Sequence, residues 1–274
     1  MGKTRFSLFI PLLLVAALIQ VIFGNPDLSV FAFPVNVAIV LVLFSGLYVL
    51  NREYATSRFV AVLASGRTAV SAIVLTGMAG LVMLFFPSLE FQKSWIFDAV
   101  LLLLVSNLFL ALLRYRGRHR WRFYLNHAGL LILVVGLAFG AADMRVMRAA
   151  VGVGESIDKA YTREGVAYSL GYDLTLKHFE TEYYDAARRM PADFLAEVVA
   201  DGESRTIKVN APWHKSWKED VYLAAHDTAG GGDKEYCVLE FVVQPWKYIA
   251  LAGLLLFVAG SLLMVWRGKK KNLS

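Results

Sequence analysis

The chain has 274 residues, of which 57% are hydrophobic, and its mean hydropathy is +0.53. Soluble domains are roughly half apolar and rarely concentrate that share in long blocks, so this composition excludes an ordinary soluble protein. The net charge of +6 does not indicate nucleic-acid binding, because the basic residues gather in four clusters beside apolar stretches, as in the loops of membrane proteins.

Six apolar stretches predict membrane spans, because a bilayer core needs roughly 20 residues per helix. They are Phe6–Phe23, Val30–Leu50, Thr68–Phe86, Trp95–Leu113, Tyr124–Ala142 and Trp246–Trp266. The first is the weakest, since it contains Pro11 and Gln20, and its alternative interpretation is a cleaved signal peptide. No small-residue cleavage site follows it, so a retained span is favoured.

The basic residues predict the orientation of these spans, because cytoplasmic loops of membrane proteins are rich in Lys and Arg. All four clusters fall on one side if the chain crosses the membrane six times. The clusters are Lys3 and Arg5; Arg52, Arg58 and Arg67; Arg114, Arg116, Arg118, Arg120 and Arg122; and Arg267, Lys269, Lys270 and Lys271. We therefore expect an integral membrane protein with both termini in the cytoplasm.

The predicted organisation has five parts. They are a two-span hairpin at 1–50, a cytoplasmic linker at 51–67, spans three to five at 68–142, an extracytoplasmic domain at 143–245, and span six with a basic tail at 246–274. The fold class is an α-helical membrane protein with an antiparallel β-rich domain between spans five and six.

The extracytoplasmic segment has β-type patterning. Tyr172–Tyr184 is rich in aromatic and β-branched residues, and an Asp201-Gly202 turn between two strand-like runs predicts a hairpin. A flexible loop is expected around Gly230–Gly232, before a last strand at Tyr236–Val243. Cys237, the one cysteine, shares a face of that strand with apolar residues, so a core thiol is favoured over a redox role.

His127 is the unusual histidine, because it lies within span five, about one turn from the predicted cytoplasmic face. An ionisable residue inside a span is a functional hypothesis by default. Gly129, Gly136 and Gly140 share one helix face that suits close packing, and His127 points nearly opposite to it. Its face is thus free for a haem edge or another subunit; the alternative is an interfacial histidine bonded to lipid headgroups or to Asn126.

Other polar residues give weaker signals. Asp98 lies near the outer end of span four, where it either snorkels to the interface or takes part in function, and Asn107 is expected to bond a neighbouring helix. His214 and His226 lack a third ligand, so no metal site is predicted. No phosphate loop or hydrolase motif is present, so no catalytic residue is assigned and the chain alone is not expected to be an enzyme.

From Arg67 to Trp266 the chain resembles the ResB-type (CcsB) proteins of System II cytochrome c maturation. The resemblance depends on motifs in a fixed order rather than on any one of them. They are Ser94-Trp95-Ile96-Phe97 with Asn107-Leu108-Phe109, Asn126-His127-Ala128-Gly129, Gly152-Val153-Gly154-Glu155, His178-Phe179-Glu180, Val209-Asn210-Ala211-Pro212, and Tyr222 before the final strand.

The resemblance implies a subunit of a cytochrome c synthase that helps move haem across the membrane and present it to apocytochrome c. It implies a CcsA/ResC-type membrane partner and transiently bound haem b, shared with that partner, with His127 as the candidate axial ligand. Contact candidates for partner or substrate are Asn210, Pro212, Trp213 and Asp98. Two departures from the family are a short soluble domain and two extra N-terminal spans.

Two other functional interpretations stay open. One is a haem b-binding anchor subunit of an electron-transfer complex, although such a site usually needs two histidines in the bundle and only His127 lies in a span. The other is a structural scaffold in which His127 is incidental.

Overall fold

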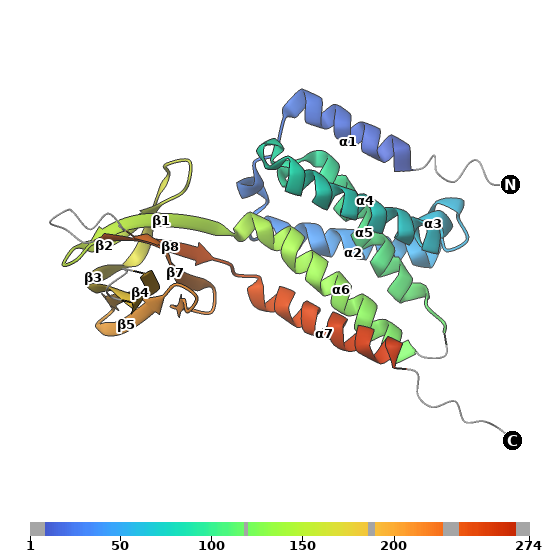
Figure 1. The fold of residues 1–274 in the computed structure, drawn as a ribbon. Coiled ribbons are helices and arrows are strands. Elements are labelled where there is room, and N and C mark those ends of the chain that lie inside the picture. The colour runs from blue at the N-terminus through green and yellow to red at the C-terminus, as the bar shows by residue number, and fades with distance from the viewer. Residues whose placement is uncertain (1–8, 118–119, 186–189, 227–235, 267–274) are drawn as a thin grey trace, which may run out of the picture. The chain divides into compact units, whose positions relative to one another are not determined.

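The computed structural model describes residues 9–117, 120–185, 190–226 and 236–266. Its contacts divide the chain into two compact units, one of 1–142 with 246–274 and one of 143–245. The first is helical and the second is a β-sheet (Figure 1).

The helical unit contains seven α-helices in the described part of the chain. They are α1 (Phe9–Phe23), α2 (Val35–Glu53), α3 (Arg58–Leu63), α4 (Gly66–Phe85), α5 (Trp95–Arg114), α6 (Arg120–Gly140) and α7 (Lys247–Val265). Five of them, α2 and α4 to α7, are long and apolar enough to cross a membrane. This finding supports a membrane protein. Because α1 has only 15 described residues, the predicted first span, which would be the sixth in number, stays a prediction.

A shifted helix start and an additional helix differ from the sequence prediction for local reasons. The second span begins at Val35 rather than Val30, because a 3₁₀ turn (Leu28–Phe31) and Pro34 precede it. The predicted linker at 51–67 contains α3, whose first turn is capped by the side chain of Ser57. Six residues are too few to give a clear helical period, which is why the sequence prediction missed this helix.

Helix α5 is the centre of the helical unit and packs against α1, α2, α4 and α6. Asn107, in its buried middle, donates hydrogen bonds to the carbonyl oxygens of Leu63 (2.7 Å) and Ser65 (3.2 Å). The expectation that Asn107 bonds a neighbouring helix is therefore confirmed. These bonds satisfy carbonyl groups where α3 ends and α4 begins, a place where backbone acceptors otherwise lack partners.

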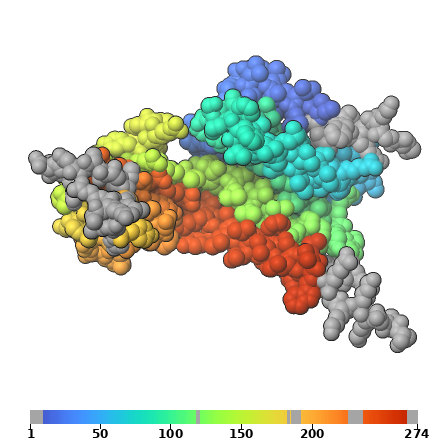
Figure 2. All heavy atoms as spheres, in the orientation of Figure 1, coloured from blue at the N-terminus to red at the C-terminus, as the bar shows by residue number. Residues whose placement is uncertain are grey.

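Helices α6 and α7 pack backbone against backbone, and they lie side by side in the space-filling view (Figure 2). A Cβ added at Gly129 would lie 2.3 Å from the amide nitrogen of Phe257, and one at Gly136 would lie 3.0 Å from that of Ala250. The predicted small-residue face of span five is thus confirmed. Gly253 and Gly260 provide the same close approach from α7, a contribution that the sequence did not single out.

The second unit is one antiparallel sheet of eight strands in the order β5-β4-β3-β2-β1-β8-β7-β6. The strands are β1 (Arg145–Gly152), β2 (Ser156–Tyr161), β3 (Ala167–Asp185), β4 (Met190–Ala200), β5 (Glu203–Lys208), β6 (Trp213–His214), β7 (Glu219–His226) and β8 (Tyr236–Val243). The predicted hairpin joins β4 to β5, with Asp201 and Gly202 both at positive φ (53° and 78°), as a two-residue turn of this type requires.

The sheet curls so that β5 contacts β7, which gives an incompletely closed barrel around one apolar core. Cys237 lies in that core with no exposed surface, next to Leu239 and Phe241 on the same face of β8, and burial raises the pKa of its thiol to about 12. The loop predicted around Gly230–Gly232 lies outside the described residues.

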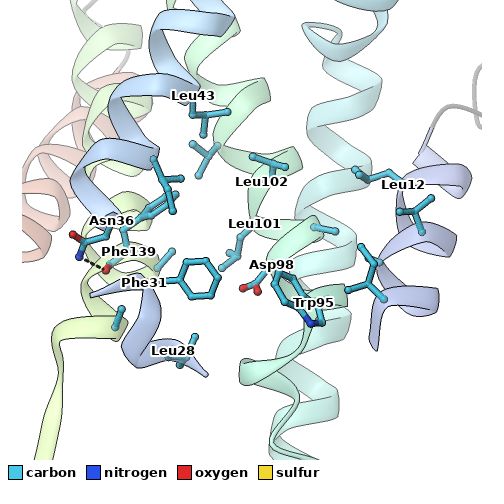
Figure 3. Close-up of a pocket in the computed structure, with 18 residues that line it drawn as sticks. Leu12, Leu28, Phe31, Asn36, Leu43, Trp95, Asp98, Leu101, Leu102 and Phe139 are labelled. Carbon is cyan, nitrogen blue, oxygen red and sulfur yellow. Dashed lines mark hydrogen bonds between the residues drawn. The ribbon is translucent and has the colours of Figure 1, made fainter. Parts of the chain in front are cut away.

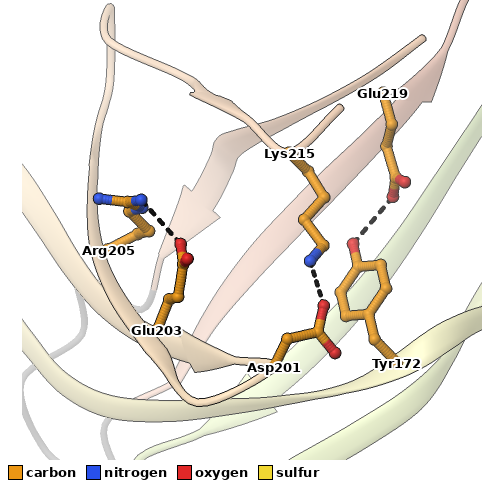
Figure 4. Close-up of polar contacts among 6 residues, drawn as sticks. All are labelled: Tyr172, Asp201, Glu203, Arg205, Lys215 and Glu219. Carbon is orange, nitrogen blue, oxygen red and sulfur yellow. Dashed lines mark hydrogen bonds and ion pairs between the residues drawn. The ribbon is translucent and has the colours of Figure 1, made fainter. Parts of the chain in front are cut away.

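Polar side chains join the edges of the barrel where backbone pairing stops (Figure 4). Lys215 pairs with Asp201 and lies over the rings of Tyr172 (4.6 Å) and Trp213 (5.3 Å). The hydroxyl of Tyr172 donates to the carboxylate of Glu219 (2.8 Å). Burial and that neighbouring carboxylate raise the pKa of Tyr172. These contacts link β3 and the β4–β5 turn to the β6–β7 hairpin.

Candidate functional site at the start of helix α6

His127 is part of a stack of three rings at the N-terminal end of α6. The imidazole lies on the ring of Phe123, with 3.7 Å between centroids and 21° between planes. Phe123 in turn stacks on Tyr115, the residue that ends α5, at 3.7 Å and 5°. Because Phe123 and His127 are four residues apart, they share one helix face, and the stack fixes that face against the end of α5.

A hydrogen bond fixes the imidazole as well. Its Nδ1 atom lies 3.1 Å from the carbonyl oxygen of Phe123. A carbonyl oxygen can only accept, so Nδ1 carries the proton in this contact and the neutral ring keeps its lone pair on Nε2. Nε2 makes no hydrogen bond to any residue in the described ranges. The ring is therefore held through one nitrogen and half-buried, with the other nitrogen available to a ligand.

A different face of α6, about 100° around the helix from His127, is fixed to α7. Asn126 donates a hydrogen bond to the hydroxyl of Ser261 (2.7 Å), and Arg122 donates to the carbonyl oxygen of Trp266 (3.1 Å). The interpretation that His127 bonds Asn126 is therefore wrong, because Asn126 faces α7 while His127 bonds the backbone of its own helix. The face of α6 that carries His127 therefore takes no part in these contacts with α7.

The imidazole of His127 fits one axial position of a haem site. Haem iron accepts an axial imidazole nitrogen. Histidines that bind metals almost always donate their other ring N–H to a carbonyl or carboxylate, which fixes the tautomer and ring orientation. His127 has this arrangement with Phe123. No second histidine lies in the described helices of this unit, so a second axial ligand would come from elsewhere.

Asp98 lies in a different place from His127. It is in the first turn of α5, at the end of the bundle where α6 finishes, and lines an apolar cavity with Trp95 and Phe139 (Figure 3). Residues 127 and 139 are twelve positions apart on α6, which is roughly 18 Å along a helix. The structure thus separates these two predicted site residues within the helical unit.

The other three predicted residues lie together in the β unit. Asn210 is exposed in a two-residue loop between Lys208 and Ala211, whose backbones pair. Pro212 follows, half-buried, and Trp213 in β6 packs on the core beneath Lys215. Of the three, Asn210 is thus the most accessible to a partner.

Sequence reasoning missed several residues of these sites. Trp217 is 61% exposed at the tip of the β6–β7 hairpin, close along the chain to Trp213. The Tyr115–Phe123 stack and the lining of the cavity by Trp95 also went unnoticed. An exposed Trp beside turn-forming residues was the available signal for Trp217, whereas the stack needs the relative placement of two helices, which spacing cannot supply.

Comparisons with known proteins bear on this arrangement. Residues 115–239, slightly less than half of the chain, match the model of the ResB-like family. The match includes His127, Asn210, Pro212 and Trp213 but not Asp98, and it confirms the resemblance predicted from the motifs. A solved chain titled Cytochrome c Heme Lyase CcmF is similar over 97% of this chain and 46% of its own length, with 13% identity and a TM-score of 0.39. This chain therefore spans about half the length of that protein. No curated protein matches.

Proposed function

We propose that this chain, whose residues 115–239 match the ResB-like family, acts in cytochrome c biogenesis as a subunit of a haem-attaching synthase. Its cargo is haem b, which it helps to move across the membrane and present to apocytochrome c. The observation that carries the proposal is the anchored His127 ring, with Nδ1–H on the carbonyl of Phe123 and Nε2 without a partner among the described residues.

His127 is the proposed axial ligand for haem in transit. The carbonyl of Phe123 holds the ring in the tautomer whose Nε2 can bind iron, and the stack of Phe123 and Tyr115 restricts its rotation. Restricting rotation before the ligand arrives lowers the entropy lost on binding. Haem bound there would supply only its iron and its apolar edge; attachment to apocytochrome c needs other groups.

The number of axial ligands that haem needs points to a site shared with another protein. A membrane haem usually takes two axial ligands, and the spans contribute only His127. We propose that a CcsA/ResC-type partner supplies the second ligand against the face of α6 that α7 does not cover. Haem b is then shared at the interface and held transiently.

The β unit is the proposed contact for apocytochrome c or for the partner. Asn210 and Pro212 present a loop edge, and the indole of Trp213 lies beside them. Aromatic side chains with one accessible edge are frequent at protein interfaces. We propose that this unit lies on the outer side of the bacterial cytoplasmic membrane with both termini inside, a proposal supported by the basic clusters and the positive-inside rule.

The test is to purify the full chain with and without a CcsA-type partner and to record haem absorption spectra. We expect His127→Ala to lower haem retention of the complex by tenfold or more (roughly the loss of one strong ligand bond). His178→Ala is the matched control, since His178 lies on the surface of the β unit and should change nothing.

Two results would contradict the proposal. Unchanged haem retention in the His127→Ala complex would remove the ligand assignment. A bis-histidine spectrum from the chain without any partner would favour the electron-transfer anchor, in which the chain holds its haem alone.

A further inference from the structure

A cavity of about 380 Å³ lies between α1, α2, α5 and α6, within the helical unit. Its volume falls in the range of small-molecule sites, roughly 300–1,000 Å³. Most of its wall is aliphatic, with Leu12, Ile19, Leu43 and Leu102 among the lining residues (Figure 3). Rings of Phe31, Trp95 and Phe139 line it toward the end where α5 begins.

Two polar groups at that end lack partners. The indole N–H of Trp95 is buried and makes no hydrogen bond to any described residue. The carboxyl group of Asp98, one turn later, likewise makes no hydrogen bond or ion pair within the described part of the chain. An unsatisfied buried donor destabilises a protein by about 1–3 kcal/mol, so a ligand that accepts from this N–H would stabilise the site.

Asn36 does not fill this role, although it also lines the cavity. Its amide donates to the carbonyl oxygen of Phe139 (3.0 Å), and its own side-chain oxygen accepts from the amide of Val37 (2.8 Å). The first of these bonds joins α2 to α6 and the second stays within α2. Trp95 and Asp98 are left as the two polar groups at the cavity that could serve a ligand.

The lining selects the chemistry of that ligand. It contains no Lys, Arg or His among the described residues, and Asp98 would repel an anion, so a fatty acid or a phospholipid headgroup is disfavoured. A plain acyl chain would fill the aliphatic part but leave both polar groups unsatisfied. The edge-to-face pair of Phe31 and Trp95 (6.3 Å, 84°) at the polar end suits a flat ring.

We propose that this cavity binds an uncharged ring carrying carbonyl or hydroxyl oxygens on a lipophilic tail, the chemical class of the isoprenoid quinones and quinols. A hydroxyl of the reduced form reaches Asp98, and the tail follows the aliphatic wall. One ring oxygen accepts from the Trp95 indole once that side chain turns its buried N–H toward the cavity. The proposal concerns binding alone. It does not depend on His127, which lies roughly 18 Å away along α6.

The experiment uses the full chain in nanodiscs of synthetic phosphatidylcholine, with decylubiquinone as the probe. Decylbenzene, which has a ring and the same tail but no oxygen, is the ligand control, and empty nanodiscs measure partition into lipid. We expect saturable binding of one decylubiquinone per chain and none of decylbenzene above partition.

Two pairs of variants locate the site. Ala138→Phe fills the cavity, whereas Leu137→Phe adds the same ring at an exposed position on the same helix. Trp95→Phe removes only the donor, whereas Trp121→Phe removes an exposed indole at the other end of α6. We expect Ala138→Phe to abolish binding and Trp95→Phe to weaken it roughly tenfold, with both controls unchanged.

The proposal is overturned if decylubiquinone only partitions into lipid, if decylbenzene binds equally well, or if Trp95→Phe binds as the wild type does. Should Ala138→Phe fail to fold, Trp95→Phe still decides, because it adds no bulk. Mass spectrometry of chain purified from native membranes gives a second readout. A bound quinone that Trp95→Phe loses supports the site, and phospholipid alone contradicts it.

Discussion

The side-chain amide of Asn126 donates to the hydroxyl of Ser261, 2.7 Å away on α7, and that hydroxyl donates to the carbonyl oxygen of Phe257 at 2.8 Å. The residue directly before His127 is thus tied to the neighbouring helix. Since successive residues on a helix point 100° apart, fixing Asn126 toward α7 also fixes the direction in which His127 points.

Removing this link should weaken both the helix pair and the site. We expect Asn126→Ala to lower the free energy of unfolding by about 0.5–2 kcal/mol, the value of a polar contact between membrane helices. Ser261→Ala should give a similar loss, and the double variant should lose no more than either single one. Denaturation in mixed detergent micelles, followed by circular dichroism, measures the free energy of unfolding. Fully additive losses would show that Asn126 and Ser261 act separately.

The glycine contacts predict a larger effect. Gly129→Ala places a methyl group against the backbone of Phe257, so the helices must separate, at a loss of about 1–3 kcal/mol of stability. Gly80→Ala on α4 is the control, because a Cβ there has no neighbour within 4 Å. The same micelle denaturation compares them. A Gly129→Ala protein as stable as Gly80→Ala would mean that α6 and α7 are not in close contact.

The sequence predicted some of these features and not others, for identifiable reasons. The Asp201-Gly202 turn and the strand at Tyr236–Val243 follow from local signals, and β8 has those same bounds. The glycine face of α6 follows from helical periodicity alone. The ring stack on His127 does not, because it needs Tyr115 from the end of α5.

The cavity likewise depends on packing rather than on pattern. Asp98 alone is compatible with a side chain that reaches the membrane surface, as the sequence allowed. Only the assembled helices show that Trp95 and Asp98 lie beside residues of α1, α2 and α6. Periodicity reports which face of a helix is apolar, and it carries no information on where four such faces leave a space.

The polar contacts at the barrel edges give a prediction for the β unit. Tyr172→Phe removes the donor to the Glu219 carboxylate, and we expect a loss of about 1–2 kcal/mol in local stability. Tyr184→Phe is the control, since Tyr184 is 81% exposed. Amide hydrogen exchange of β6 and β7 in the full chain should accelerate only in the first variant; equal protection in both would contradict a role in closing the sheet.

The buried thiol predicts a dependence on pH. The pKa of Cys237 rises from 9.0 to about 12 on burial, so between these values the unfolded chain has lost a proton that the folded chain keeps. Stability therefore falls as pH rises above about 9, by up to roughly 1.4 kcal/mol per pH unit. The raised pKa of Tyr172 acts in the same direction at still higher pH.

Cys237→Ala separates the contribution of the thiol. The variant starts from a lower stability because it leaves a small gap in the core, but its decline between pH 9 and 10 should be shallower than that of the wild type. Thermal unfolding of the β unit by circular dichroism at several pH values measures both. Parallel curves for the two proteins would show that the thiol ionises at its ordinary pKa.

The pairing of β1 with β8 runs without a break from Arg145 opposite Val243 to Gly152 opposite Tyr236. The β unit therefore begins and ends on neighbouring strands, as a domain inserted between two consecutive helices does. Such an inserted domain can be replaced as a unit. Relatives could vary this unit, or an engineer could graft another into its place, while α6, α7 and the orientation of His127 stay as they are.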